Sequence, residues 1–213
     1  MDLTKWTHSC VTLEKDGGKL VLDPGAFSEA SAALADATAV LVTHEHPDHL
    51  DVDAVRTALA ADDELQLCAP AAVAEQFAEF GDRVRAVTGG SAFDVGGFSV
   101  RTFGDQHAVI HPRIPVIANV GYLVDDSVFH PGDSFTVPEV PVRVLLVPAT
   151  APWARVADAV DFAISVRAPR ALPIHEAVYS EVGRDIANRL VEGFVSGFGS
   201  EYAPVPVGSS ITV

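Results

Sequence analysis

The most chemically distinctive stretch of the chain is VTHEHPDHLD, residues 42 to 51, in which three histidines and three acidic residues follow a short apolar run. His44 and His46 are two residues apart, so on an extended backbone both imidazoles project from one side and can bind a single cation. Asp48 and His49 follow on the turn and can reach a second position beside the first. The spacing therefore predicts two neighbouring cation sites that need a bridging ligand.

The residue types in this stretch indicate the kind of ion and the kind of reaction. Imidazole nitrogen and carboxylate oxygen suit zinc, manganese or iron, and neither Cys10 nor Cys68 lies near the cluster in sequence to supply a thiolate. Two such ions about 3.5–4 Å apart can hold a hydroxide between them, because coordination lowers the pKa of water from about 15.7 toward about 7. The stretch therefore predicts hydrolysis at neutral pH. The alternative, a solvated loop of unrelated charges, fits the spacing less well.

The elements that position this cluster follow from the apolar pattern. Residues 39 to 42, AVLV, predict a short buried strand that ends where the histidines begin. VTLEK and KLVLD flank Asp16-Gly17-Gly18, which predicts an antiparallel hairpin near the N-terminus. Helices are expected at 28–37, 52–61, 70–80, 154–166 and 178–195, and further strands at 65–68, within 84–128, and at 143–147 and 171–174. This order, strands and then α/β, occurs twice and predicts two similar halves with sheets inside and helices outside.

Length, composition and charge narrow the class of protein. The 213 residues are expected to form one domain, residues 1 to 213, and no apolar run approaches the roughly 18 residues that a membrane helix needs, so no membrane partner is predicted. The opening MDLTKWTHSC lacks the features of a secretory signal, which favours a cytoplasmic location. The formal net charge of −15 disfavours a nucleic-acid partner.

At this point the chain resembles a known family. HEHPDH, residues 44 to 49, resembles the HxHxDH signature of the metallo-β-lactamase fold hydrolases. Asp23 in LVLDPG, His107 in FGDQHA, Asp133 in FHPGDS and His175 in ALPIHEA match further family positions in the same order. WTHSC, HPGDS and PIHEA together are most similar to the small branch that includes ascorbate-phosphate lactonase and uncharacterised metal-dependent hydrolases. The resemblance implies an αββα sandwich, with two stacked mixed sheets flanked by helices and metals at one sheet edge.

The resemblance also implies a set of seven metal ligands. The first ion would be held by His44, His46 and His107, the second by Asp48, His49 and His175, with Asp133 shared by both. Two divalent ions are therefore the expected cofactors, with zinc favoured and manganese or iron as alternatives. Asp48 and Asp133 are the expected catalytic carboxylates. His111, next to Pro112, competes with His107 for the place of the third histidine.

Four further residues are expected to support the ligands and not to bind metal. Asp51 extends the motif to HxHxDHxD, and Asp51 and Asp23 are each expected to hold a ligand imidazole or the loop backbone. For His8 and His130 two interpretations stay open, a contact with ligands or substrate and an ordinary structural hydrogen bond. For Trp6 and Trp153 a place in the core is favoured over a place at the pocket mouth.

Two functions from different classes follow from these observations. The first is a metal-dependent hydrolase in which a hydroxide bound by two metals attacks a small ester, lactone or phosphodiester. The alternative is a non-catalytic metal-binding or sensing module of the same fold. All seven ligand positions are filled, which favours the hydrolase. The expected partner is a small-molecule substrate, and the sequence is compatible with a homo-oligomer without specifying one.

Overall fold

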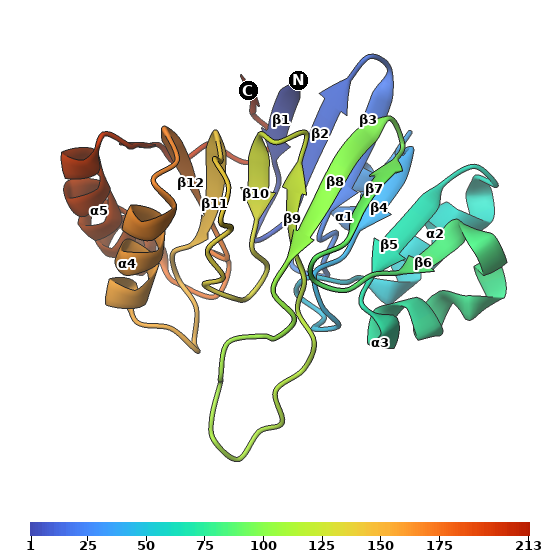
Figure 1. The fold of residues 1–213 in the computed structure, drawn as a ribbon, viewed down its shortest axis with the longest axis horizontal. Helices are drawn as coiled ribbons and strands as arrows, with labels where there is room; N and C mark the ends of the chain where they lie inside the picture. The colour runs from blue at the N-terminus through green and yellow to red at the C-terminus, as the bar shows by residue number, and fades with distance from the viewer.

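The computed structural model describes all residues from Met1 to Val213 and contains two seven-stranded β-sheets (Figure 1). The first sheet has the order β14-β1-β2-β3-β4-β5-β6, and the second has the order β13-β12-β11-β10-β9-β8-β7. The strands of the first sheet are β1 (Asp2–Lys5), β2 (Val11–Lys15), β3 (Gly18–Leu22), β4 (Ala39–Leu41), β5 (Gln66–Ala69), β6 (Val84–Ala86) and β14 (Ser210–Thr212). Those of the second are β7 (Ala92–Val95), β8 (Phe98–Phe103), β9 (Gly121–Val124), β10 (Val128–His130), β11 (Val144–Pro148), β12 (Arg170–Ile174) and β13 (Glu201–Tyr202).

Helices cover the outer faces of both sheets. They are α1 (Ala30–Leu34), α2 (Val52–Ala61), α3 (Ala71–Ala74), α4 (Val156–Val166) and α5 (Glu181–Val195), with 3-10 segments at Glu75–Arg83 and Ser196–Phe198. Figure 1 shows α4 and α5 together against the second sheet, α2 and α3 beside the first, and the two chain termini next to each other. None of these helices combines the length and the apolar character that crossing a membrane requires.

Three buried clusters correspond to the layers of the sandwich. Along β3, Leu20 and Leu22 pack between the two sheets, whereas Val21 faces the helices on the outside, because successive strand residues point to opposite faces. The cluster between the sheets takes residues from both, and each outer cluster joins one sheet to its own helices. This arrangement confirms the expected αββα sandwich.

Each sheet is antiparallel on one side and parallel on the other. In the first sheet β1, β2 and β3 are antiparallel neighbours and β3 to β6 are parallel. In the second, β7 to β10 are antiparallel and β10 to β13 are parallel. The expected similarity of the two halves is therefore confirmed. The segments that leave the carboxyl ends of β3, β4, β10, β11 and β12 carry most of the candidate site.

Several local expectations are confirmed and others need correction. The hairpin of β2 and β3 and the helix at 52–61 form as expected. The helix expected at 28–37 is only α1, because Ala35 is extended and Asp36 has a φ of 57°. The helix expected at 70–80 breaks into α3 and a 3-10 segment in which Phe77 is not helical. Between β8 and β9 the chain forms a long loop instead of strands, and this loop extends away from the sheets (Figure 1).

Candidate metal centre

The structure brings all seven expected ligands together in two adjacent groups. The first group consists of His44, His46, His107 and Asp133, and the second consists of His8, Asp48, His49 and His175. Within each group the potential ligand atoms all lie within 4.8 Å of one another. His111 belongs to neither group and is exposed, so the geometry favours His107 as the third histidine of the first group.

Asp133 lies between the two groups and contacts both. Its Oδ2 is 3.2 Å from Nε2 of His107 in the first group and 3.1 Å from Nε2 of His175 in the second. Its Oδ1 is 3.0 Å from Nε2 of His49. The backbone N–H of Asp133 donates to Oδ1 of Asn119, which fixes the loop after β10. Asp133 therefore occupies the position that a bridging ligand requires.

The outer ring nitrogens of the ligand histidines are held by hydrogen bonds to the protein. The hydroxyl of Thr43 donates its proton to Asp23, so it can only accept from Nδ1 of His44, 3.0 Å away. Nδ1 of His107 donates to the carbonyl of Ala108 at 2.6 Å. With Nδ1 occupied as a donor, the neutral imidazole presents an unprotonated Nε2 to the interior of the site.

His175 follows the same rule, since its Nδ1 donates to the carbonyl of Thr150 at 2.9 Å. In their neutral forms, His107 and His175 would both turn an Nε2 lone pair toward Oδ2 of Asp133. A lone pair that faces a carboxylate oxygen is repulsive unless a cation or a proton lies between them. The donor set thus fits divalent metal ions, which take imidazole nitrogen and carboxylate oxygen together.

Two further contacts support this fit. Nε2 of His44 and Nδ1 of His46 lie 3.1 Å apart, with both nitrogens directed into the first group. Oδ1 of Asp133 is buried and makes no hydrogen bond, although Nε2 of His49 lies 3.0 Å away. A buried acceptor without a partner costs about 1–3 kcal/mol, which a bound cation would offset.

The electrostatics separate the histidines into two kinds. Burial lowers the pKa of His44 and His46 below the ordinary imidazole value, so both are neutral. For His175 burial acts in the same direction, but hydrogen bonds with Asp133 and Asp48 outweigh it and raise its pKa to about 9. The carboxylates of Asp133 and Asp23 likewise raise the pKa of His49 against the effect of burial. In the metal-free protein, His175 and His49 therefore hold protons at positions where metal ions would bind.

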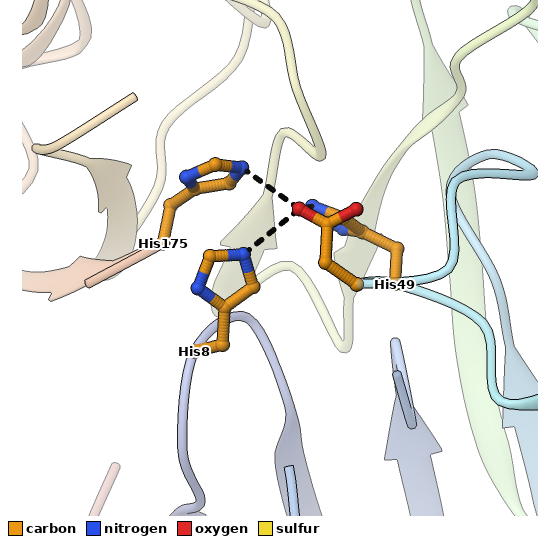
Figure 2. A group of neighbouring side chains, drawn as sticks. His8, His49 and His175 are labelled. Carbon is orange, nitrogen blue, oxygen red and sulfur yellow. Dashed lines mark hydrogen bonds and ion pairs between the residues drawn. The ribbon is translucent and has the colours of Figure 1, made fainter. Parts of the chain in front are cut away.

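The second group is organised around the carboxylate of Asp48. Nε2 of His8 lies 3.0 Å and Nε2 of His175 lies 3.5 Å from Oδ2 of Asp48. Figure 2 shows that His8, His49 and His175 lie close together. Nδ1 of His8 accepts a hydrogen bond from the backbone N–H of Ala177, so the proton of the neutral ring is on Nε2. His8 therefore donates to Asp48 and has no lone pair left for a metal.

The other three supporting residues have different roles. Asp23 is fully buried, and its Oδ2 accepts from Nδ1 of His49 at 2.6 Å, as expected for a residue that orients a ligand. Asp51 touches no site imidazole; its carboxylate accepts from the backbone N–H of Ala54 and caps α2, so of the two roles expected for it only a contact with backbone is found. His130 uses both nitrogens for the backbone, donating to Ser9 and accepting from Gly132, and is structural.

Trp153 is the main residue that the sequence interpretation placed wrongly. Its indole N–H donates to Oδ2 of Asp133 at 2.9 Å, and its ring centroid lies 5.7 Å from that of His107 and 6.0 Å from that of His175. Trp153 is therefore a half-buried wall of the site and not a core residue. Its position after β11 places it at the same sheet edge as the ligands, but its contact with Asp133 has no signal in the local sequence.

A buried ion pair supports the second group from outside. Nζ of Lys5 lies 2.8 Å from Oε1 of Glu176 and donates to the carbonyl of His8 at 2.7 Å. The same Oε1 accepts from the backbone N–H of His8 at 3.0 Å. This pair ties the end of β1 in the first sheet to the residue after His175 in the second. Glu176 lies in the PIHEA stretch beside His175, but no sequence pattern indicated its pairing with Lys5.

Comparisons with known proteins agree with this geometry. A family model described as the beta-lactamase superfamily domain matches residues 2–175. The chain is 41% identical to Protein Rv0786c of Mycobacterium tuberculosis over 204 residues. These residues cover 93% of this chain and 95% of that protein. It is 30% identical over 183 residues to UPF0173 protein PF0020 of Pyrococcus furiosus, with 82% of each chain covered.

Solved structures share the same architecture. Igni18, a metallo hydrolase from Ignicoccus hospitalis, superposes with a TM-score of 0.75 at 17% identity, covering 99% of this chain and 97% of that one. At this identity the likeness shows the fold alone. Because the family model covers most of the residues and the solved structure repeats the fold, the chain belongs to the beta-lactamase superfamily and has the metallo-β-lactamase fold.

Proposed function

We propose that this protein is a dinuclear metal-dependent hydrolase of a small ester, lactone or phosphodiester. The observation that carries the proposal is the pair of ligand groups that share Asp133. Two divalent ions held there would supply Lewis acidity, lowering the pKa of water toward neutrality and polarising the substrate oxygen. Zinc is the ion we assign first, with manganese or iron as alternatives, because all donors are nitrogen or oxygen.

The residues of the chain itself hold the ligands in place before any ion binds. Carbonyl groups orient the imidazoles of His107 and His175, and Asp23 orients that of His49. The side chain of Asp48 is 18% exposed and that of Asp133 only 3%, so solvent reaches the centre from the Asp48 side. Substrate would enter from this side.

We also propose a cytoplasmic location and a small-molecule partner. Cys10 and Cys68 are both buried free thiols, as in proteins of reducing compartments. The site segments present carboxylates and imidazoles with few cations, which is unsuited to nucleic acid.

The test of the proposal is turnover of generic substrates by matched variants. Metal-loaded wild type is assayed on an ester, a lactone and a phosphodiester beside Asp133→Ala. Glu45→Gln is the control, because Glu45 lies in the same motif and is exposed. We expect turnover of at least one substrate by wild type and Glu45→Gln, and a loss of at least a hundredfold in Asp133→Ala. Wild-type rates in Asp133→Ala would contradict the proposal, and metal binding without turnover would favour a sensing module.

A further inference from the structure

Exposed apolar side chains surround the metal centre. Phe27, in the segment after β3, is 48% exposed, and its ring centroid lies 5.5 Å from that of His8. Val109 is 58% exposed and follows His107 by two residues. Single exposed apolar residues are ordinary, but residues that gather at one site mark a binding surface.

A cavity lies beside the first ligand group and includes Val109. Its volume is about 580 Å³, within the range of small-molecule sites, and its lining includes His107, Val109 and Phe135. The ring of Phe135 lies 5.2 Å from that of Trp153, which itself contacts Asp133. The apolar side chains of this cavity are Ala108, Val109 and Phe135, and the rest of its lining is polar.

Cations for an anionic substrate are scarce in the same segments. Among residues 6–10, 23–29, 43–51, 104–120, 131–137, 149–155 and 175–180, the basic residues are Arg113 and Arg155. Arg155 is paired with Asp158 at 2.7 Å, and Lys5, just outside these segments, is paired with Glu176. Arg113 is exposed on the long loop, six residues past His107.

Acidic residues are numerous in these segments. There are eight of them: Asp23, Glu29, Glu45, Asp48, Asp51, Asp105, Asp133 and Glu176. Two bound ions would neutralise the carboxylates that hold them, but an anionic group elsewhere on a substrate would still meet excess negative charge. The charge of these segments therefore favours a substrate without an anionic group, and the exposed apolar side chains beside the centre can contact its uncharged part.

We propose that the centre hydrolyses a neutral ester or lactone whose alkyl or aryl part packs against Phe27, Val109, Phe135 and Trp153. This inference rests on the proposed function and selects among its substrate classes. Water adds to the acyl carbon, the bond from that carbon to the leaving oxygen breaks, and one water proton passes to the leaving oxygen. The resulting acid releases its proton to solvent.

The test uses p-nitrophenyl esters with straight acyl chains from acetyl to octanoyl and metal-loaded protein. We expect kcat/KM to rise by up to about fourfold for each added methylene. The mono-p-nitrophenyl ester of suberic acid matches the octanoyl ester in length but ends in a carboxylate. We expect its kcat/KM to be lower by about tenfold. Bis-p-nitrophenyl phosphate should be the poorest substrate of the series.

A matched pair of variants locates the apolar contact. Phe27→Ala should lower kcat/KM for the octanoyl ester by about tenfold and for the acetyl ester by less than about twofold. Phe198→Ala is the control, because Phe198 is 53% exposed but lies away from the metal ligands. It precedes β13, and Glu201 of β13 pairs with Arg170, at the end of β12 that is opposite to His175. It should behave as wild type on both esters.

A binding measurement gives a readout that does not depend on turnover. In a Trp6→Phe background Trp153 is the one remaining tryptophan, so its fluorescence reports occupancy beside Asp133. 1-Octanol should change this fluorescence at concentrations about tenfold lower than 8-hydroxyoctanoate, which has the same hydroxyl end.

The outcomes separate the two proposals. Turnover that prefers the suberoyl ester or the phosphodiester, or shows no dependence on chain length, would overturn the substrate class and leave the hydrolase standing. Absence of turnover of all esters, lactones and phosphodiesters with two ions bound would instead overturn the proposed function.

Discussion

At the scale of single residues, the site combines strained backbone with histidines held by hydrogen bonds. Asp23, His8 and His175 have φ values of 48°, 63° and 69°, in the left-handed region that residues other than glycine seldom adopt. Such conformations cost about 1–3 kcal/mol each and persist where the surroundings fix them. Here the buried pair of Lys5 and Glu176 holds His8 through its carbonyl and its N–H. These backbone conformations place the imidazoles of His8 and His175 in the second group and the carboxylate of Asp23 beside His49.

The role of His8 can be separated from that of His130. His8→Gln removes the imidazole donor to Asp48 and should weaken binding of the second metal by about 10–100-fold, as expected for a residue that orients a ligand. His130→Gln should reduce thermal stability but leave both metal affinities within about threefold, since both ring nitrogens of His130 hydrogen-bond to the backbone and its Nε2 is 3.6 Å from Oδ2 of Asp23, beyond hydrogen-bond distance. Titration of metal-free protein with zinc checks both variants. Equal losses of metal affinity would show that the two histidines act alike.

Metal binding should compete with protons. Carboxylate contacts raise the pKa of His175 to about 9 against the effect of burial, so at pH 7 the metal-free site holds a proton there. An incoming ion must displace this proton, and the apparent affinity should therefore rise with pH and level off near pH 9. Calorimetry in buffers of different ionisation enthalpy measures the protons released. Affinity that falls as pH rises from 6 to 9 would contradict the assigned protonation.

At the scale of elements, the sequence predicted the strand ends better than the loops. The strand AVLV and the following histidines could be recognised because a buried run and a dense polar motif are both local signals. The break of the helix expected at 70–80, where Phe77 leaves helical geometry, depends on packing and has no local signal. Trp153 contacts Asp133 only because β10 and β11 are neighbours, and that pairing cannot be read from either segment alone.

The close approach of Gly25 to the ligand loop gives a prediction at this scale. A Cβ on Gly25 would lie 1.8 Å from the carbonyl oxygen of Asp48 and 2.6 Å from the amide nitrogen of His49. Gly25→Ala must displace this backbone. We therefore expect the variant to lose the second metal and its Tm to fall by several degrees. Gly193→Ala is the matched control: it meets no atom within 4 Å in α5 and should stabilise by up to about 1 kcal/mol. Full metal content in Gly25→Ala would contradict this account of the loop.

At the scale of the whole molecule, the candidate ligands connect the two halves of the sandwich. His44, His46, Asp48 and His49 follow β4 of the first sheet, whereas His107, Asp133 and His175 belong to the second. Neither half holds a complete site. The sequence predicted the two halves from the repeated order of elements, but the way their edges meet depends on the stacking of the sheets, which no local pattern specifies.

Removal of metal should therefore loosen the contact between the sheets. With free metal at about a hundred times its Kd, bound ions stabilise the fold by about 2.7 kcal/mol per site, and each kcal/mol corresponds to about 2–4 °C in a chain of this size. Chelation should lower Tm by about 5–10 °C for each site that is emptied, which is about 10–20 °C for both, and zinc should restore it. Differential scanning calorimetry checks this, and a Tm unchanged by chelation and reloading would show that the ions do not join the sheets.

The central claim is that one chain holds two metal ions that share Asp133. The most direct measurement is the number of metal ions per chain, determined by elemental mass spectrometry. The protein is purified without chelator or affinity nickel and is then reloaded with zinc. We predict about two ions per wild-type chain and loss of metal in Asp133→Ala. Fewer than one ion per wild-type chain after reloading, or two in Asp133→Ala, would contradict the account.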